Sequence, residues 1–148
     1  MTILRVLLDT NVLVSYLLLP LPGRPPSLAI EAALAQAYTL LLPIQLVEEL
    51  FRAVAAKPYL ADRIAASDAQ RLIDALAAVA ELAPTLREPF SEVGRDRNDD
   101  YLLAYCRAYQ VDVLVTGDLD LLALAEGEGD TIVRPAKFAR LLDERKEP

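Results

Sequence analysis

The sequence of 148 residues contains no histidine and no tryptophan, and it has one cysteine and one methionine. Without histidine, an imidazole base and the usual histidine-containing zinc sites are excluded. Cys106 alone cannot form an internal disulfide or a multi-cysteine metal site, so nothing indicates an oxidising compartment. Any chemistry must therefore use carboxylates, hydroxyls, amides, a few Lys and Arg, and, where one binds, a hard metal ion.

Long hydrophobic runs are also missing. A membrane-spanning helix needs roughly 20 consecutive apolar residues, whereas the longest candidate, residues 12–21, is interrupted by Ser15 and Pro20. Residues 1–8 lack the basic start and the small-residue cleavage site of a signal peptide. We therefore expect a cytoplasmic protein, and 54% hydrophobic residues predict one packed domain over residues 1–148.

Acidic residues outnumber basic ones, with 22 Asp and Glu against 15 Lys and Arg and a formal net charge of -7. This balance argues against a passive nucleic-acid coat protein, which is usually basic. It is compatible with an enzyme whose acids gather around metal ions.

Short apolar runs rich in strand formers alternate with segments of helical spacing. Strands are expected at residues 3–8, 38–42, 82–86, 111–115 and 131–133. Helices are expected after Ser27, over residues 44–56, after a capping box that starts at Ser67, and after Asn98 as a cap. The alternation predicts an α/β fold with three layers, α/β/α, around a central parallel sheet of about five strands.

Carboxylates are predicted at the carboxyl ends of the strands, where parallel α/β sheets bind ligands. These positions are Asp9 after the first strand, Glu49 beside the buried face of its helix, Asp99 and Asp100 at a helix start, and Asp118 and Asp120 after the fourth strand. Each acid also has a local explanation in a helix dipole, a turn or a surface ion pair. These local explanations account for Asp9 least well, because a carboxylate that ends an apolar strand is costly to bury without a partner.

Four chain segments thus bring carboxylates to one edge of the sheet, without a cluster of Lys or Arg to neutralise them. Like charges held close raise one another's pKa unless a cation intervenes. Mg²⁺ or Mn²⁺ prefers oxygen ligands and commonly works beside phosphates. In phosphodiester hydrolysis, one or two such ions generate hydroxide from water and stabilise the leaving oxygen, and no histidine is needed.

The motifs and their order resemble the PIN-domain nucleases, many of which are toxins of bacterial toxin-antitoxin pairs. That family has an apolar strand ending in Asp-Thr/Ser-Asn, a central helix with Glu before Leu, an Asp opening a later helix, and a final Thr-Gly-Asp-x-Asp-Leu. The matching segments are residues 8–13, 46–50, 96–104 and 115–122. The resemblance implies a PIN-like fold and a metal-dependent endoribonuclease, usually a homodimer, with a small antitoxin partner in the toxin branches.

Carried over by position, the resemblance implies that the catalytic, metal-binding acids are Asp9, Glu49, Asp99 and Asp118. Asp100 is the alternative to Asp99, or a second contributor. Glu48 is the alternative to Glu49, and only the Glu-Leu pattern of the family favours Glu49.

The resemblance also assigns supporting roles. Asp120 would support the site or bind a second ion, and Asn11 and Thr116 would orient Asp9 and water through hydrogen bonds. In the mechanism we expect, an activated water attacks phosphorus in line, and Glu49 positions or deprotonates that water.

An RNA substrate also requires cationic side chains for its phosphates. The candidates near the predicted site are Arg52, Lys57, Arg95, Arg97 and, in the proline-rich loop 20–26, Arg24. For each of them, the alternative is a solvated surface charge. Three tyrosines are candidates for stacking on bases, although core packing is the stronger interpretation of each; these are Tyr16, Tyr59 and Tyr101.

Two other functions are consistent with acids at strand ends. One is a PIN-like protein that binds RNA or a partner without cutting it. The other is a phosphoacceptor receiver module, for which Lys137 resembles the late lysine, but residues 82–87 supply no acceptor Asp after the third strand. The receiver is therefore the weakest of the three hypotheses.

Overall fold

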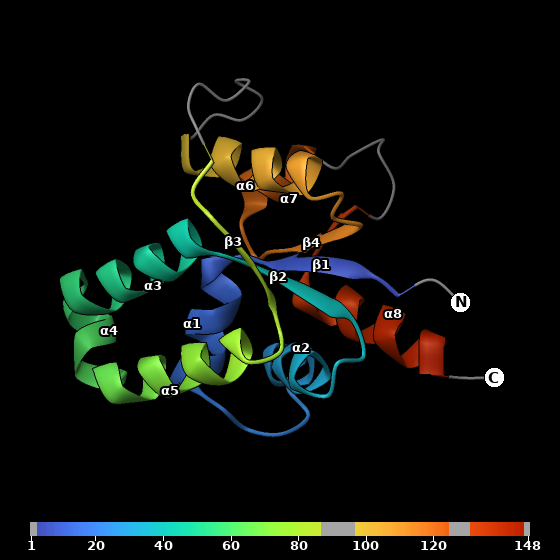
Figure 1. Ribbon diagram of the computed structural model, residues 1–148. Helices are drawn as coiled ribbons and strands as arrows, with labels where there is room; N and C mark the ends of the chain where they lie inside the picture. The colour runs from blue at the N-terminus through green and yellow to red at the C-terminus, as the bar shows by residue number, and fades with distance from the viewer. Residues whose placement is uncertain (1–2, 87–96, 125–130, 147–148) are drawn as a thin grey trace.

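The computed structural model of the protein describes residues 3–86, 97–124 and 131–146, and for residues 97–100 and 146 the backbone alone. Its centre is a sheet of β1 (Arg5–Leu8), β2 (Thr39–Pro43), β3 (Glu81–Ala83), β4 (Val113–Val115) and β5 (Ile132–Val133). The strand order is β3-β2-β1-β4-β5, and every neighbouring pair is parallel. The prediction of a central parallel sheet is confirmed (Figure 1).

Helices cover both faces of the sheet, as the predicted three-layer arrangement requires. Helices α6 (Arg97–Ala108) and α7 (Leu119–Leu124) lie on one side, and α1 (Thr10–Leu18), α2 (Pro25–Leu34) and α8 (Pro135–Lys146) on the other (Figure 1). After β2, helix α3 (Ile44–Ala56) packs against α1, α4 (Pro58–Arg63) and α5 (Ala66–Ala77). Among the described residues, no helix is long and apolar enough to cross a membrane.

The core lies where helices meet both faces of the central strands. Strands covered on both faces read as continuous apolar runs rather than alternating ones, and Leu7, Leu41 and Leu114 are accordingly fully buried. Helix α3 turns Leu46 and Leu50, four residues apart, into the same core. This spacing leaves Glu49 at the border between the buried and the solvent-facing sides of the helix.

Three predicted helix starts are wrong in detail. Helix α2 begins at Pro25, whose fixed φ suits a first helical turn, so Ser27 lies buried inside the helix instead of capping it. Helix α5 has Ala65 at its N-cap without a side-chain hydrogen bond, and Ser67 lies inside the first turn. Helix α6 begins one residue before Asn98, so this residue also lies within the helix.

Candidate active site

The carboxylate of Asp9 lies where β1 and β4 end side by side. Leu8 is paired with Val115, so the next residues, Asp9 and Thr116, meet at the carboxyl edge of the sheet. The hydroxyl of Thr116 donates to Oδ2 of Asp9 at 2.7 Å. The backbone N–H of Thr10 donates to Oδ1 at 2.7 Å, which makes Asp9 the N-cap of α1.

Asn11 connects these two segments. Its amide nitrogen donates to Oδ2 of Asp9 at 2.9 Å and to Oγ1 of Thr116 at 3.3 Å. Its amide oxygen accepts from the N–H of Gly117 at 3.0 Å, and Oγ1 of Thr116 accepts from the N–H of Asp118 at 3.0 Å. Asn11 and Thr116 therefore both contact Asp9, and their predicted role in orienting water stays a prediction.

The electrostatic environment opposes the charge on Asp9. The residue is 7% exposed, and burial is the main cause that raises the pKa of its carboxyl. Hydrogen bonds from Thr116 and Thr10 lower this pKa, whereas the negative charges of Glu49 and Asp118 raise it, and the net direction is upward. Within the described part of the chain, none of these three acids forms an ion pair with Lys or Arg.

A cleft of about 240 Å³ opens beside Asp9. Side chains from α1, α3, α4, α6 and the segment after β4 line it; they are Asp9, Thr10, Asn11, Val14, Glu49, Ala53, Lys57, Leu60, Leu102 and Asp118. Three of the predicted acids, Asp9, Glu49 and Asp118, thus share one cleft. Glu48 is exposed outside it, so the geometry favours Glu49 over its neighbour.

Tyr101 holds Glu49 in this cleft, a contact that the sequence did not reveal. The Tyr101 hydroxyl donates to Oε2 of Glu49. The ring of Tyr101 is 2% exposed and packs edge to face against Tyr105, with ring centroids 6.1 Å apart. Burial first, and then the Glu49 carboxylate, raises the pKa of the Tyr101 hydroxyl, so it stays protonated and remains a donor. Core packing was the right interpretation of this tyrosine, but its hydroxyl also reaches the site.

Of the remaining predicted acids, the structure describes the side chain of Asp120 but not those of Asp99 and Asp100. Asp120 is exposed in the first turn of α7, outside the cleft lining, and its N–H donates to Oδ1 of Asp118 at 2.8 Å. Asp99 and Asp100 belong to the first turn of α6, and their side chains lie outside the described residues. Among the side chains that are described, no three acids or cysteines form a group that could hold a metal ion.

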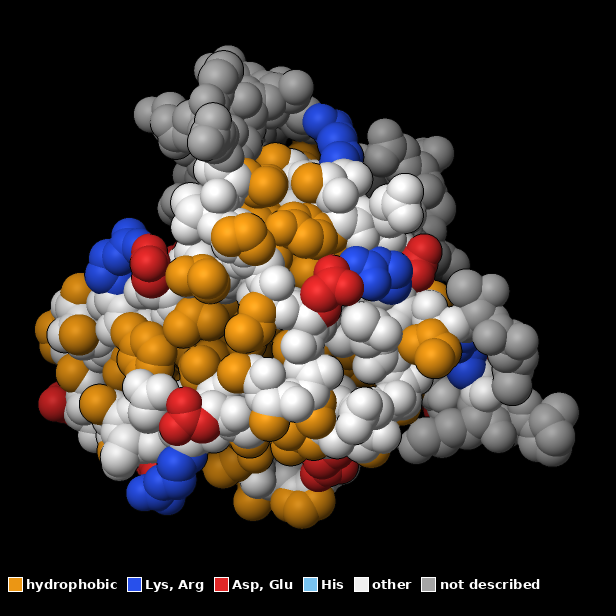
Figure 2. All heavy atoms as spheres, viewed as in Figure 1, with side chains coloured by type: hydrophobic (Ala, Val, Ile, Leu, Met, Phe, Trp, Pro, Cys, Tyr) orange, Lys and Arg blue, Asp and Glu red, His pale blue; other side chains and the backbone are white. Residues whose placement is uncertain are grey.

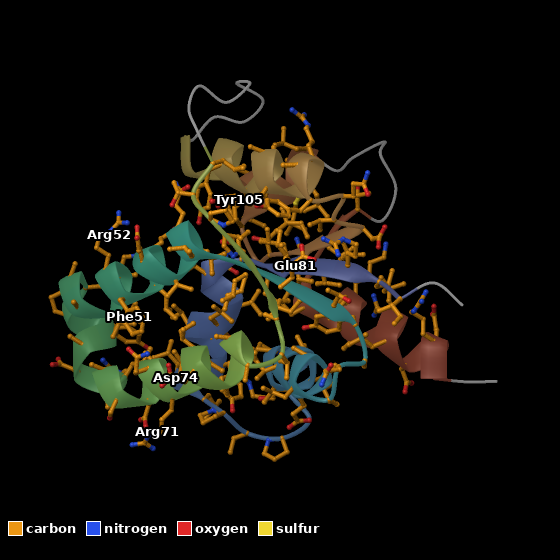
Figure 3. All side chains as sticks on the ribbon, in the orientation of Figure 1. Phe51, Arg52, Arg71, Asp74, Glu81 and Tyr105 are labelled. Atoms are coloured by element: carbon orange, nitrogen blue, oxygen red, sulfur yellow. The ribbon has the colours of Figure 1, made fainter. Side chains whose placement is uncertain are left out.

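The predicted phosphate-binding residues lie in different places, and of the described ones only Lys57 lines the cleft. Lys57, between α3 and α4, lines the cleft, whereas Arg52 extends outward from α3 and is not part of the lining (Figure 3). Arg95 lies outside the described residues, and so does the side chain of Arg97. Arg24 does not reach the cleft, because its guanidinium donates to the carbonyls of Ser15 and Leu19 at the end of α1.

The sequence places this arrangement in a known family. A family model described as PIN domain matches residues 5–120. The chain belongs to the PIN-domain family. PIN domains are generally nucleases and typically bind divalent metal ions, and the match spans the chain from β1 to Asp120. No curated protein sequence matches this PIN-domain chain significantly.

Solved structures share the fold. The crystal structure of PAE2754 from Pyrobaculum aerophilum is 17% identical, with a TM-score of 0.63 over 95% of this chain and 90% of that one. The PilT N-terminus domain protein SSO1118 from Sulfolobus solfataricus P2 is 11% identical, with a TM-score of 0.55 over 94% and 93%. A domain of a functionally unknown protein from Methanocaldococcus jannaschii is 19% identical, with a TM-score of 0.54 over 86% and 88%. The PIN-like fold that the resemblance implied is thus confirmed.

The bond between Tyr101 and Glu49 predicts a measurable loss of stability in Tyr101→Phe. A buried hydroxyl that donates to a carboxylate contributes more than a neutral hydrogen bond, so the free energy of unfolding should fall by about 1–2 kcal/mol. Urea unfolding monitored by circular dichroism measures this value. Tyr109→Phe, directly after the end of the same helix, is the control, because the described residues offer its hydroxyl no hydrogen bond; equal losses in both variants would contradict the assignment.

Proposed function

We propose that this PIN-domain protein is a Mg²⁺- or Mn²⁺-dependent endoribonuclease. The observation that carries the proposal is the placement of Asp9, Glu49 and Asp118, from three separate elements, along one cleft with Lys57 at its wall. Carboxylates that share a cleft without a paired cation suit divalent ions, and a lysine beside them suits a phosphate. Family membership supports nuclease chemistry, and RNA as the substrate is our inference.

The donor set fits a hard divalent ion. Every polar side chain among the acids and their immediate partners offers oxygen, and the desolvated Asp9 carboxylate faces like charges that a cation would offset. Asp9 and Asp118 would hold the ion, together with Asp99 or Asp100 from α6, and Asp120 would support the site or bind a second ion. When bound, such an ion lowers the pKa of water and offsets the charge that develops on the phosphate.

The chain's own residues supply position and proton transfer. Asp9 is fixed by donors from Thr10, Asn11 and Thr116, so it cannot turn away from the cleft without breaking three hydrogen bonds. Glu49 uses Oε2 to accept from Tyr101, which leaves Oε1 to orient the attacking water and accept its proton. Lys57 would bind a phosphate of the RNA at the wall of the cleft.

The alternatives receive less support. A PIN-like protein that binds RNA without cutting it has the same fold and the same acids, so turnover distinguishes it. A receiver module is disfavoured by the family match and by the end of β3, which is followed by Pro84, Thr85 and Leu86 without an acid.

Cleavage of RNA should require the acids and a divalent ion. Purified protein is incubated with RNA of mixed sequence, and with single-stranded DNA of the same sequence, in Mg²⁺, Mn²⁺ or EDTA. We expect RNA cleavage only with a metal ion, no cleavage by Asp9→Asn or Asp118→Asn, and unchanged circular dichroism in both variants. Full activity of Asp9→Asn, with contaminating nuclease excluded, would refute the assignment, and RNA binding without turnover would favour the non-cutting alternative.

Neighbouring glutamates provide a matched test of the proton acceptor. Glu49→Gln keeps the shape of the side chain and its bond to Tyr101 but loses the base, so kcat should fall about a hundredfold or more. Glu48→Gln makes the same change one residue away, outside the cleft, and should stay within twofold of the wild type. Equal kinetic constants for both variants in a gel-based cleavage assay would exclude Glu49 from the reaction.

The proposed phosphate contact of Lys57 predicts a binding defect. Lys57→Gln should raise KM more than it lowers kcat. The slope of log Kd against log salt should also decrease by about one, because one phosphate contact releases about one counterion. Arg52→Gln is the control, since Arg52 points away from the cleft (Figure 3). Fluorescence anisotropy of labelled single-stranded RNA at several salt concentrations measures the slope. A control variant with the same change in slope would show that only overall charge matters.

We also propose that the protein is a homodimer and the toxin of a toxin-antitoxin pair. The face shown in Figure 2 carries a broad apolar area around β3 and the neighbouring helices. Strand β3 is at one end of the sheet order. Two apolar side chains in this area are exposed: Leu82 in β3, at 54%, and Ile44 at the start of α3, at 44%. Among the described strands, β3 has a neighbour on one side only, and an edge strand with exposed apolar side chains favours association with another chain.

Light scattering on the purified protein tests this face. We expect a mass twice the 16.2 kDa of one chain, and Leu82→Lys should shift the protein to the monomer, whereas Leu28→Lys on α2 should not. A monomeric wild type would overturn the homodimer. A small DNA-binding protein encoded beside this gene would support the antitoxin, and co-purification of the two chains would test their contact.

A further inference from the structure

A second hollow, of about 330 Å³, adjoins the cleft at its acids. Asn11 and Asp118 line both spaces. The other walls of the second space come from α1, the start of α2, the segment after β4 and the start of α8; they are Val12, Ser15, Pro26, Gly117 and Pro135. We call this space the proline hollow. Asn11 and Asp118 form a shared wall, so a chain bound in the cleft can continue past them into the hollow.

The two spaces differ in chemistry. The cleft has Lys57 and three carboxylates in its lining. The hollow has two prolines and a valine, and among the described residues Asp118 is the one charged residue that lines it. At Gly117, a Cβ would have Asn11 as its nearest neighbour, at 3.6 Å, an ordinary contact distance. Apolar walls suit a nucleobase better than they suit a charged phosphate.

Arg24 contacts Ser15, one of the residues that line the hollow. Arg24 donates from Nη2 to Oγ of Ser15 at 3.3 Å, and from Nη1 to the Ser15 carbonyl at 3.3 Å. Its charge is therefore held beside Ser15 by the end of α1, without filling the hollow. The hollow is therefore an apolar space whose Ser15 wall is fixed by hydrogen bonds from Arg24.

We propose that the proline hollow is a substrate subsite that holds one unpaired nucleotide next to the scissile phosphate, across Asp118 from Lys57. The proposal rests on the proposed function. Ligand sites of small-molecule size are roughly 300–1,000 Å³, so a hollow of about 330 Å³ is large enough for one nucleotide.

The experiment combines variants of the hollow with substrates that lack one base. A single-stranded oligoribonucleotide with a mapped cleavage site is prepared intact and with an abasic residue at each position around that site. Ser15→Leu fills the hollow, and Ser15→Ala removes the same hydroxyl but leaves the space open. In the wild type and in Ser15→Ala, kcat/KM should fall roughly tenfold or more at one abasic position adjacent to the cut, because the substrate loses the burial of one base against apolar walls.

Ser15→Leu should cleave the intact substrate roughly tenfold less efficiently and show no further loss at that abasic position. Pro135→Ala, which removes part of a wall, should reduce the abasic penalty without moving the cleavage site. The inference is overturned if Ser15→Leu cleaves the intact RNA like the wild type, or if the abasic penalty is the same in Ser15→Leu and Ser15→Ala. If the wild type cleaves no RNA at all, the proposed function fails first, and the two failures are thus distinguishable.

Discussion

The buried carboxylate of Asp9 is the constraint on which the site depends. Its charge is desolvated at the end of β1, and it is retained because three donors converge on it from α1 and from the end of β4. One of them, Thr116, reaches Asp9 only because β1 and β4 pair in parallel with Leu8 beside Val115. The strand register, the start of α1 and the orientation of the acid are therefore one structural feature, and a shift in any of them would leave a buried charge without its donors.

The amino and carboxyl edges of the sheet differ in the arrangement of their charged side chains. At the amino edge, Arg5 forms an ion pair with Glu81 at 2.8 Å, and Oδ2 of Asp112 accepts from its N–H. At the carboxyl edge, the acids of the cleft raise the pKa of Asp9 instead of being neutralised. A fold that pairs its charges at one edge and concentrates like charges at the other retains an electrostatic cost at the second edge. Such a cost is expected where function requires a cation, so the distribution of acids is more informative than the net charge of -7.

The strands and the acids at their ends were predictable because both follow local rules: buried parallel strands are continuously apolar, and ligands bind beyond their carboxyl ends. Interactions between distant residues were not predictable. Tyr101 and Glu49 are 52 residues apart, and the hydroxyl that links them has no signature in the period of either helix. The capping box at Ser67 was wrong because Ala65 starts the helix with favourable backbone angles and no side-chain contact. Arg24 looked like a phosphate ligand, but the carbonyls at the end of α1 were nearer partners.

Helix α6 shows how packing far from the cleft fixes what lies in it. Tyr101 and Tyr105 in the helix and Tyr109 directly after its end follow one another at i, i+4 and i+8. The ring of Tyr105 contacts the rings of the other two. Tyr105 donates to the carbonyl of Pro84 at 2.8 Å and accepts from the segment after β3, which ties the helix to the edge of the sheet (Figure 3). The carbonyl of Tyr109 accepts from Nε of Arg5 at the opposite edge. The rotation of α6 is thus set along its length by buried rings and by both edges of the sheet, and the Tyr101 hydroxyl reaches Glu49 as a consequence of that packing.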